Sequence, residues 1–557
     1  LAWTDDGRRL AFYRDGRPTV LDRAQTSDRR FDVPERGPFL GEREMLSWGP
    51  DDRRLAYRFV DFETTQVGVI DAETGEMVWR SRHRSYATGD PQWLGDGRLL
   101  VDRSGERGTV REVVAVSVAD GTERVLYRET DREHGTYSRG APVVSPDGER
   151  IALALPEDGW EHVHVIAVDS GDRRQLTAGD FEDKGLADSQ PRWLSTSELV
   201  FASNRADPGR RGIYAVDLQG STRSLVAPTG TAVHPRPSPD GSRLAYVYAD
   251  PTVGPELRLS ALDREEPRRI THSTVADWPT DPIEPERVRF DSVDGLEIEG
   301  YLLDPRASDA VDSDAADLPA VVWVHGGPMR QMRDGWHPSR SYGLAYTFQQ
   351  YLAERGYVCL SVNYRGGIGY GAAFRRALAG TRGDREMADI VAGAEYLREL
   401  DAVDADAVGM WGLSYGGYAA LQLLGTHPEA FDVAINLAGL ADLELYRDWA
   451  EENKYPAAAS SMAVRLGGEP WEATEAWEQA SPVTHVENYD TPLYSFHGTA
   501  DRYVNFEQLD CVVDALLETG ADHEWEYYPD ETHVFSNRAT WERVLATIEA
   551  AFDEHLR

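Results

Sequence analysis

The segment GMWGLSYGGYAAL, residues 409–421, has the spacing of a serine nucleophile held on a sharp turn. Ser414 has glycine two positions before it and two positions after it, with an apolar run ahead and an alanine-rich run behind. These runs predict a strand that reverses into a helix at Ser414. Gly412 and Gly416 permit a tight turn that lifts the hydroxyl out of the sheet, and Gly417 lets the helix pack closely. Ser414 is therefore the candidate nucleophile for acyl transfer.

A serine nucleophile needs a general base and a carboxylate that orients the base. Asp501 lies just past the predicted strand TPLYSFHG, in HGTADRYV, and His533 lies past the following strand, in YYPDETHVF. Both residues fall on loops at the carboxyl ends of strands, where open sheets carry their sites. The chain order serine, aspartate, histidine is that of α/β-hydrolases. We predict that Ser414, Asp501 and His533 form a catalytic triad.

Other histidines and carboxylates near these segments have plainer interpretations. His497 precedes a turn glycine, His427 ends a helix, and Asp530 and Glu531 are typical loop charges. The acidic stretch DAVDADAVG (401–409) has neither the spacing nor the turn glycine of a calcium loop, so we interpret it as a turn. The sequence contains no glycine-rich phosphate loop. We therefore predict that the reaction needs neither a metal nor a cofactor.

The tetrahedral intermediate of acyl transfer needs hydrogen-bond donors for its oxyanion. The backbone N–H of Tyr415, directly after the nucleophile, is the first predicted donor. The second is expected from HGGP, residues 325–328, which follows the first predicted parallel strand. We favour the N–H of Gly327, because glycine lets the chain approach the oxyanion. An ordinary strand-ending turn is the alternative interpretation of HGGP.

The chain divides into two regions with different sequence patterns, and the candidate residues lie in the second. Over residues 1–275, pairs of short apolar runs around a turn recur every 44 to 51 residues, which is typical of propeller blades. From 276 to 557, apolar runs alternate with helical stretches, which predicts a mainly parallel sheet covered by helices on both faces. We therefore predict a β-propeller of six visible blades followed by an α/β-hydrolase domain. The equivalent residues of the six repeats are Leu10, Leu55, Leu100, Ile151, Val200 and Leu244.

The composition narrows the class of partner. The formal net charge is −38, from 96 acidic against 58 basic residues, which argues against nucleic acid or an anionic membrane surface as a partner. Lys184 and Lys454 are the only lysines, and so few lysines among so many carboxylates fit a surface adapted to high salt. Cys359 and Cys511 form no disulfide framework. With no leader-like or membrane-spanning segment in sight, we expect a soluble, cytoplasmic protein.

The sequence resembles the prolyl oligopeptidase family of serine peptidases, and most closely its acylaminoacyl peptidase branch. The resemblance runs along the whole chain: SPDG repeats are followed, in the expected order, by HGGP, NYRGGIGYG (363–371), GLSYGGY, HGTAD and DETHVF. It implies a seven-bladed propeller that caps an α/β-hydrolase, with a cavity between them that admits short peptides. It also implies the triad and the oxyanion hole assigned above, that is, Ser414, Asp501, His533, Tyr415 and Gly327.

Three positions depart from the pattern of the family. Thr532 stands before the catalytic histidine, where many relatives have glycine. Tyr503 occupies the place where relatives often carry an arginine or asparagine that grips a substrate carbonyl, and Arg502 is one place early. The dipeptidyl peptidases of the family clamp a free amino terminus with paired glutamates, and Glu265-Glu266 is the only adjacent pair in the propeller. We interpret this pair as a solvated edge.

We predict a cytoplasmic serine peptidase that acts on short peptides and releases an N-acylated N-terminal residue. A dipeptidyl peptidase, an oligopeptidase or an esterase of the same fold are alternatives, and a propeller binding scaffold with an idle hydrolase domain is the alternative outside the enzymes. Val504, Tyr446 and Trp449 are candidate walls of an apolar pocket for the residue before the cut, although plain core packing explains them equally well. The sequence leaves open whether the chain forms a homo-oligomer.

Overall fold

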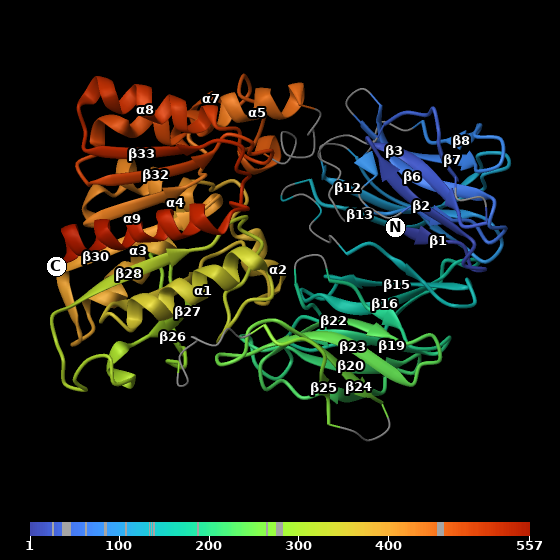
Figure 1. The fold of residues 1–557 in the computed structure, drawn as a ribbon, viewed down its shortest axis with the longest axis horizontal. Coiled ribbons are helices and arrows are strands. Elements are labelled where there is room, and N and C mark those ends of the chain that lie inside the picture. The colour runs from blue at the N-terminus through green and yellow to red at the C-terminus, as the bar shows by residue number, and fades with distance from the viewer. Residues whose placement is uncertain are drawn as a thin grey trace.

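We analysed a computed structural model of the chain. It describes residues 1–557 except 25–26, 36–45, 62–63, 83–85, 88, 106–107, 133, 135, 137–139, 187–188, 263–265, 274–281 and 454–461. The predicted domain boundary at 275/276, Glu265 and Lys454 lie outside the described residues. Figure 1 shows the N-terminal propeller, coloured blue to green, beside the C-terminal domain, coloured yellow to red.

Six antiparallel sheets form the N-terminal part, each with four strands connected in chain order. The resemblance implies a seventh blade, but the described residues form six, in agreement with the six repeats counted in the sequence. In the third sheet the additional strand β9 (Tyr86–Ala87) pairs with β11. The strands of the six blades are β1 (Ala2–Trp3), β2 (Arg9–Arg14), β3 (Arg17–Asp22) and β4 (Ser27–Arg30); β5 (Ser47–Trp48), β6 (Arg54–Asp61), β7 (Thr64–Asp71) and β8 (Met77–Arg80); β10 (Gln92–Trp93), β11 (Leu99–Gly105), β12 (Val110–Val116) and β13 (Glu123–Thr130); β14 (Val143–Val144), β15 (Arg150–Leu155), β16 (His162–Ala167) and β17 (Arg173–Gln175); β18 (Arg192–Trp193), β19 (Glu198–Ser203), β20 (Gly212–Asp217) and β21 (Thr222–Val226); β22 (Thr231–Pro237), β23 (Arg243–Ala249), β24 (Glu256–Ala261) and β25 (Arg268–Arg269).

The strand register corrects two of the predicted equivalences between blades. In the third and fifth blades, Leu99 and Leu199 occupy the repeated position opposite a tryptophan, rather than Leu100 and Val200. Successive side chains of a strand face opposite sides of the sheet, so a shift of one residue exchanges the two faces. Both residues of each pair are apolar and buried, so hydrophobicity alone did not fix the register.

Indole hydrogen bonds join the first strands of neighbouring blades. At three of the junctions, a tryptophan of one first strand donates its Nε1–H to a backbone carbonyl of the preceding first strand. A buried indole N–H needs such an acceptor, so each bond also fixes the spacing of the two strands. The bonds run from Trp48 to Ala2 (3.0 Å), from Trp93 to Ser47 (2.9 Å) and from Trp193 to Val143 (2.9 Å).

The C-terminal domain is built on one eight-stranded sheet in the order β26-β27-β29-β28-β30-β31-β32-β33. The pairs β26/β27 and β27/β29 are antiparallel and the other pairs are parallel. This arrangement confirms the predicted α/β-hydrolase architecture. The strands are β26 (Glu286–Asp291), β27 (Glu297–Leu303), β28 (Leu318–Val324), β29 (Val358–Asn363), β30 (Val403–Leu413), β31 (Val433–Leu437), β32 (Leu493–Gly498) and β33 (His523–Tyr528).

Helices cover both faces of this sheet (Figure 1). Side chains of α3, α4 and α8 share one hydrophobic core with the sheet, and those of α1 and α9 share the core on the opposite face. Both faces of the parallel strands are therefore buried, which explains their continuous apolar runs. The helices are α1 (Arg340–Ala353), α2 (Gly371–Arg376), α3 (Arg385–Arg398), α4 (Tyr415–Thr426), α5 (Leu443–Glu452), α7 (Thr474–Gln479), α8 (Glu507–Thr519) and α9 (Arg538–Leu556), and the 3-10 turns are η2 (Pro305–Ala307), η3 (Pro428–Ala430) and η4 (Pro482–Asn488).

A buried cluster of charges joins the two domains. Arg375 on α2 places Nη1 3.0 Å from Oε1 of both Glu161 and Glu182, which lie on the propeller. Lys184 Nζ lies 2.5 Å from Glu161 Oε2, and Glu182 accepts a 2.8 Å hydrogen bond from the backbone N–H of Gly369. All four charged side chains are 3% exposed or less. The interface therefore depends on compensation of charge away from water.

We expect Arg375→Met to destabilise the protein by about 3 kcal/mol or more, because the change leaves two buried carboxylates with less compensation. Arg376→Met is the matched control on the same helix. It removes a 3.1 Å ion pair with Asp131 in which the arginine side chain is 38% exposed, and we expect a loss of at most about 1 kcal/mol. Differential scanning calorimetry measures both variants. Equal losses of stability would contradict the role of Arg375.

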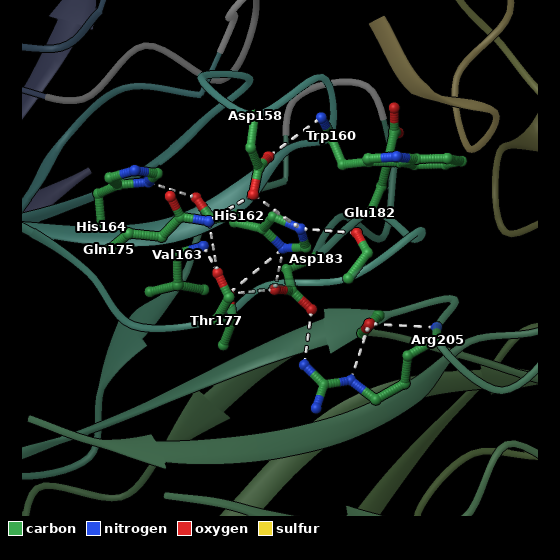
Figure 2. Close-up of polar contacts among 12 residues, drawn as sticks. Asp158, Trp160, His162, Val163, His164, Gln175, Thr177, Glu182, Asp183 and Arg205 are labelled. Atoms are coloured by element: carbon green, nitrogen blue, oxygen red, sulfur yellow. Dashed lines mark hydrogen bonds and ion pairs between the residues drawn. The ribbon is translucent and has the colours of Figure 1, made fainter. Parts of the chain in front are cut away.

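The propeller segment that carries Glu182 is anchored by a buried histidine (Figure 2). His162 Nδ1 lies 3.1 Å from Asp183 Oδ2, and Nε2 lies 2.9 Å from the carbonyl oxygen of Gly179. Asp183 also accepts from Arg205 at 2.9 Å. Both ring nitrogens of His162 thus face acceptors, and only the protonated ring donates from both. Burial by itself would lower the pKa of His162, but the hydrogen bond and charge of Asp183 raise it above its ordinary value.

A raised pKa in the folded state stabilises the fold at low pH. The contribution of His162 is complete below the pKa of the unfolded chain, about 6.5, and is lost as the pH rises through the folded-state pKa. We therefore expect His162→Gln to reduce the fall in Tm between pH 6 and pH 9. His164→Gln is the control, because burial lowers the pKa of His164, which is opposite in direction to the shift of His162. An unchanged pH profile in His162→Gln would refute the assignment.

Candidate active site

Ser414 lies on a strained turn between β30 and α4. Its backbone has φ 63° and ψ −113°, a conformation that residues with a Cβ rarely adopt. The turn is held by two backbone hydrogen bonds, from Ser414 N–H to the carbonyl of Leu437 at 2.8 Å and from Tyr418 N–H to the carbonyl of Ser414 at 2.9 Å. The predicted reversal of strand into helix at Ser414 is present in the structure.

The glycines around Ser414 are required by close backbone contacts. A Cβ at Gly416 would lie 2.0 Å from the carbonyl oxygen of Val324, and a Cβ at Gly412 would lie 2.3 Å from the backbone carbon of Gly416. A Cβ at Gly417 would lie 2.5 Å from a side-chain oxygen. The first two neighbours are backbone atoms of β28 and α4 in the buried core, so they cannot shift without disturbing the packing of both elements.

Asp501 and His533 are hydrogen-bonded to one another. His533 Nδ1 lies 2.6 Å from Asp501 Oδ2, while Asp501 Oδ1 accepts from the backbone N–H groups of Tyr503 (2.8 Å) and Val504 (3.0 Å). Burial alone would raise the pKa of Asp501, but the charge of His533 and hydrogen bonds from His497 and His533 hold it well below its ordinary value. Asp501 is therefore an ionised carboxylate hydrogen-bonded to the imidazole, as the predicted triad requires.

His497 contributes more than the sequence indicated. Its Nε2 lies 3.0 Å from the carbonyl oxygen of Val504 and 3.4 Å from Asp501 Oδ2. The residue is fully buried beneath the loop that carries Asp501. The sequence predicts only a residue before a turn glycine, whereas the structure places His497 as a support of that loop.

The sequence predicts a solvated loop charge at Glu531, but the structure buries this residue. The residue is 1% exposed, and its carboxylate accepts five hydrogen bonds at the start of α9. Burial alone would raise its pKa, but these bonds lower it to about 2. Glu531 thus fastens the loop of His533 to a helix N-terminus, where a negative charge is favourable. The donors are the backbone N–H groups of Ser536 and Asn537 and the side chains of Ser536, Asn537 and Thr540.

We expect Glu531→Gln to cost about 2 to 4 kcal/mol of stability, because the new amide group faces hydrogen-bond donors and leaves them unpaired. Asp530→Asn is the matched control, since Asp530 is exposed and its left-handed backbone (φ 61°) suits asparagine. We expect the control to change stability by less than about 0.5 kcal/mol. Thermal unfolding of both variants provides the comparison, and similar losses would show that burial of Glu531 is unimportant.

Both predicted oxyanion donors belong to segments that adjoin Ser414. Tyr415 is the first residue of α4, and a helix leaves its first N–H groups without acceptors inside the helix. Gly327 adopts φ 63°, and no heavy atom of another segment lies within 4 Å of the position that a Cβ would take there. At the neighbouring Gly326, a Cβ would lie 3.1 Å from Ser414 Cβ, so the HGGP loop directly adjoins Ser414.

The candidate substrate residues separate into two groups. Val504 and Tyr446 are buried in the same hydrophobic core, Trp449 packs against that core, and the rings of Tyr446 and Trp449 stack at 5.7 Å. Tyr503 is 53% exposed and its ring centroid lies 5.6 Å from that of His533, which places it beside the site. Arg502 is exposed. The structure thus stacks Tyr446 on Trp449 and places Val504 in the same large core, whereas Tyr503 lies beside His533.

Neither a metal site nor a membrane-spanning helix is found among the described residues. No group of three or more histidine, cysteine, aspartate or glutamate side chains in the described part of the chain is arranged to hold a metal ion. Among the described helices, none is long and apolar enough to cross a membrane.

Comparison with known proteins assigns both halves of the chain. Residues 345–557 match the prolyl oligopeptidase family, and residues 63–255 match the dipeptidyl peptidase IV N-terminal region. The chain is 24% identical over 471 residues to dipeptidyl-peptidase 5 of Porphyromonas gingivalis, covering 80% of this chain and 63% of the relative. It is 25% identical over 369 residues to the acylamino-acid-releasing enzyme of Homo sapiens, covering 62% and 47%. The alignments thus span less than two thirds of either relative.

The fold is shared with solved structures. A puromycin-hydrolyzing peptidase of Mycobacterium tuberculosis superposes with a TM-score of 0.81 at 19% identity, covering 99% of this chain and 86% of that one. The propeller and the hydrolase domain therefore occur in the same combination in both proteins. Matches to both domains, in this order along the chain, relate it to the prolyl oligopeptidase family.

Proposed function

We propose that the chain is a serine peptidase that hydrolyses short peptides, with Ser414 as the nucleophile, His533 as the general base and Asp501 as the carboxylate that orients His533. The observation that carries this proposal is a serine on a strained strand-to-helix turn, together with an aspartate and a histidine 2.6 Å apart on loops that follow strands of the same sheet. The match of residues 345–557 to the prolyl oligopeptidase family and the peptidase names of the relatives support it. Cys359 and Cys511 are both free thiols, as a cytoplasmic peptidase would have.

The residues suit a two-step acyl transfer. Ser414 Oγ attacks the peptide carbonyl carbon while His533 takes the hydroxyl proton, and the N–H groups of Tyr415 and Gly327 stabilise the resulting oxyanion. His533 then returns the proton to the leaving amine as the C–N bond breaks, leaving an acyl-enzyme. Water attacks the acyl-enzyme as His533 removes one of its protons, and that proton goes back to Ser414 when the carboxylic acid product leaves.

We infer further that the preferred substrate has a blocked amino terminus. To bind a free ammonium group, the propeller would need carboxylates whose negative charge is not already balanced by an arginine or lysine. Glu161 and Glu182 are buried against the hydrolase domain, but Arg375 contacts both, and Lys184 contacts Glu161. Their charge is already compensated, which favours a neutral acyl group over an ammonium. The names of the relatives include both dipeptidyl and acylaminoacyl activities, so dipeptidyl release is the second candidate.

The test compares wild type with Ser414→Ala in molar KCl, on one leucine chromogenic amide with its amino group acetylated or free, and on the matching ester. We expect faster cleavage of the acetylated amide and a loss of about 10⁴-fold or more in the variant. A fluorophosphonate probe should label wild type and the exposed-serine control Ser195→Ala, but not Ser414→Ala.

Each other outcome selects an alternative. Preference for the free amine would favour a dipeptidyl or aminopeptidase activity. Turnover of the ester alone would identify an esterase, and the absence of both turnover and labelling would favour a binding scaffold with an idle hydrolase domain.

A further inference from the structure

A column of aromatic rings connects the two loops that carry the proposed oxyanion donors. The rings of His325 and Tyr364 stack at 4.4 Å with 18° between their planes, and those of Tyr364 and Tyr415 stack at 5.9 Å with 14°. Tyr364 also donates its hydroxyl to the backbone carbonyl of His325 at 2.7 Å. Tyr415 and the HGGP loop are therefore connected through the side chain of Tyr364.

A buried carboxyl group holds the end of the column. Glu386 on α3 is 0% exposed, and its Oε1 accepts from the Tyr415 hydroxyl at 2.7 Å and from the backbone N–H of Gly383 at 2.5 Å. Its Oε2 is buried and has no hydrogen-bond partner among the described residues. A glutamate with one oxygen left unpaired is a costly feature of a core.

The charge that faces Glu386 comes from one arginine. The Arg382 guanidinium lies 5.2 Å from the ring centroids of both Tyr415 and Tyr418, and in the described part of the chain it makes no ion pair with Glu386 within 4.0 Å. The arginine thus packs on the rings and offsets the carboxylate charge only at a distance. This arrangement leaves the Tyr415 hydroxyl as the main side-chain partner of Glu386.

We propose that Glu386 is a positioning residue for the oxyanion hole: through its hydrogen bond to the Tyr415 hydroxyl, it fixes the main chain of Tyr415 and so the direction of the N–H that faces the oxyanion. The inference rests on the proposed function. Tyr415 is adjacent to the nucleophile, so its ring and its N–H belong to one rigid unit at the start of α4. An ionised acceptor makes such a hydrogen bond roughly twice as strong as a neutral one.

The ionised form of Glu386 lowers the stability of the fold, and this loss supports its role in positioning Tyr415. Burial raises its pKa to about 6, against the opposing effects of the Gly383 N–H, the Tyr415 hydroxyl and the Arg382 charge. A carboxyl whose pKa is raised in the folded state stabilises the fold below the unfolded pKa and loses that contribution as the pH rises through 6. At pH 8 the charged form is therefore kept at the expense of stability, as expected of a group retained for activity.

The test uses Glu386→Gln, Tyr415→Phe and the double variant at pH 8, with Glu395→Gln, an exposed residue of the same helix, as the matched control. We expect kcat on the preferred substrate to fall about tenfold in Glu386→Gln and by about 10- to 100-fold in Tyr415→Phe, with KM changed less than about twofold. The double variant should be no slower than Tyr415→Phe. Affinity for a peptide aldehyde, which forms an oxyanion on Ser414, should fall in parallel with kcat.

A merely structural role predicts different results. It would lower the Tm of Glu386→Gln and leave its kcat unchanged, whereas we expect an equal or higher Tm at pH 8 because a buried charge is removed. Wild-type kcat in both single variants, or losses that multiply in the double variant, would overturn the positioning role while the proposed function stands. An inactive wild type that the fluorophosphonate probe does not label would overturn the proposed function and this role with it.

Discussion

The close approach of two backbones at Gly416 is the constraint on which the catalytic domain depends. The helix that begins after Ser414 passes so near to β28 that even a methyl group at Gly416 would collide with the carbonyl of Val324. This contact lies two residues after Ser414, whose strained turn is held by backbone hydrogen bonds. Ser414, the proposed nucleophile, also lies beside the HGGP loop, which directly follows β28. The position of the proposed oxyanion hole thus follows from one packing distance.

A second kind of constraint, buried charge, holds the parts around this point. Arg375 links the propeller to the hydrolase domain through two glutamates, and Glu531 fastens the loop of His533 to α9. A paired charge in a core costs desolvation and stabilises little, but it is expensive to break. Such contacts therefore fix geometry more than they add stability. Arg375 and Lys184 compensate the carboxylates at the domain interface, whereas Glu531 is stabilised by five uncharged hydrogen-bond donors.

The sequence predicted those features of the fold and site that depend on residues close together in the chain. Glycine spacing identified the turn at Ser414, and the alternation of apolar runs placed Asp501 and His533 after strands. It did not separate Asp530 from Glu531, because adjacent carboxylates look alike until distant segments bury one of them. Glu386 was missed for the same reason, since its partner Tyr415 lies 29 residues away along the chain. The shift at Leu99 and Leu199 shows a further limit, as two adjacent apolar residues leave strand register ambiguous.

The indole bonds between first strands make the propeller modular. Each of these tryptophans is held by a carbonyl at the same position of the blade before it, so the junction does not depend on which blade supplies the carbonyl. Loss of the second blade would present Trp93 with the carbonyl of Ala2 in place of that of Ser47. Duplication would likewise create a junction that already has its donor and acceptor. The number of blades can therefore change during evolution without new hydrogen-bond donors or acceptors at these junctions.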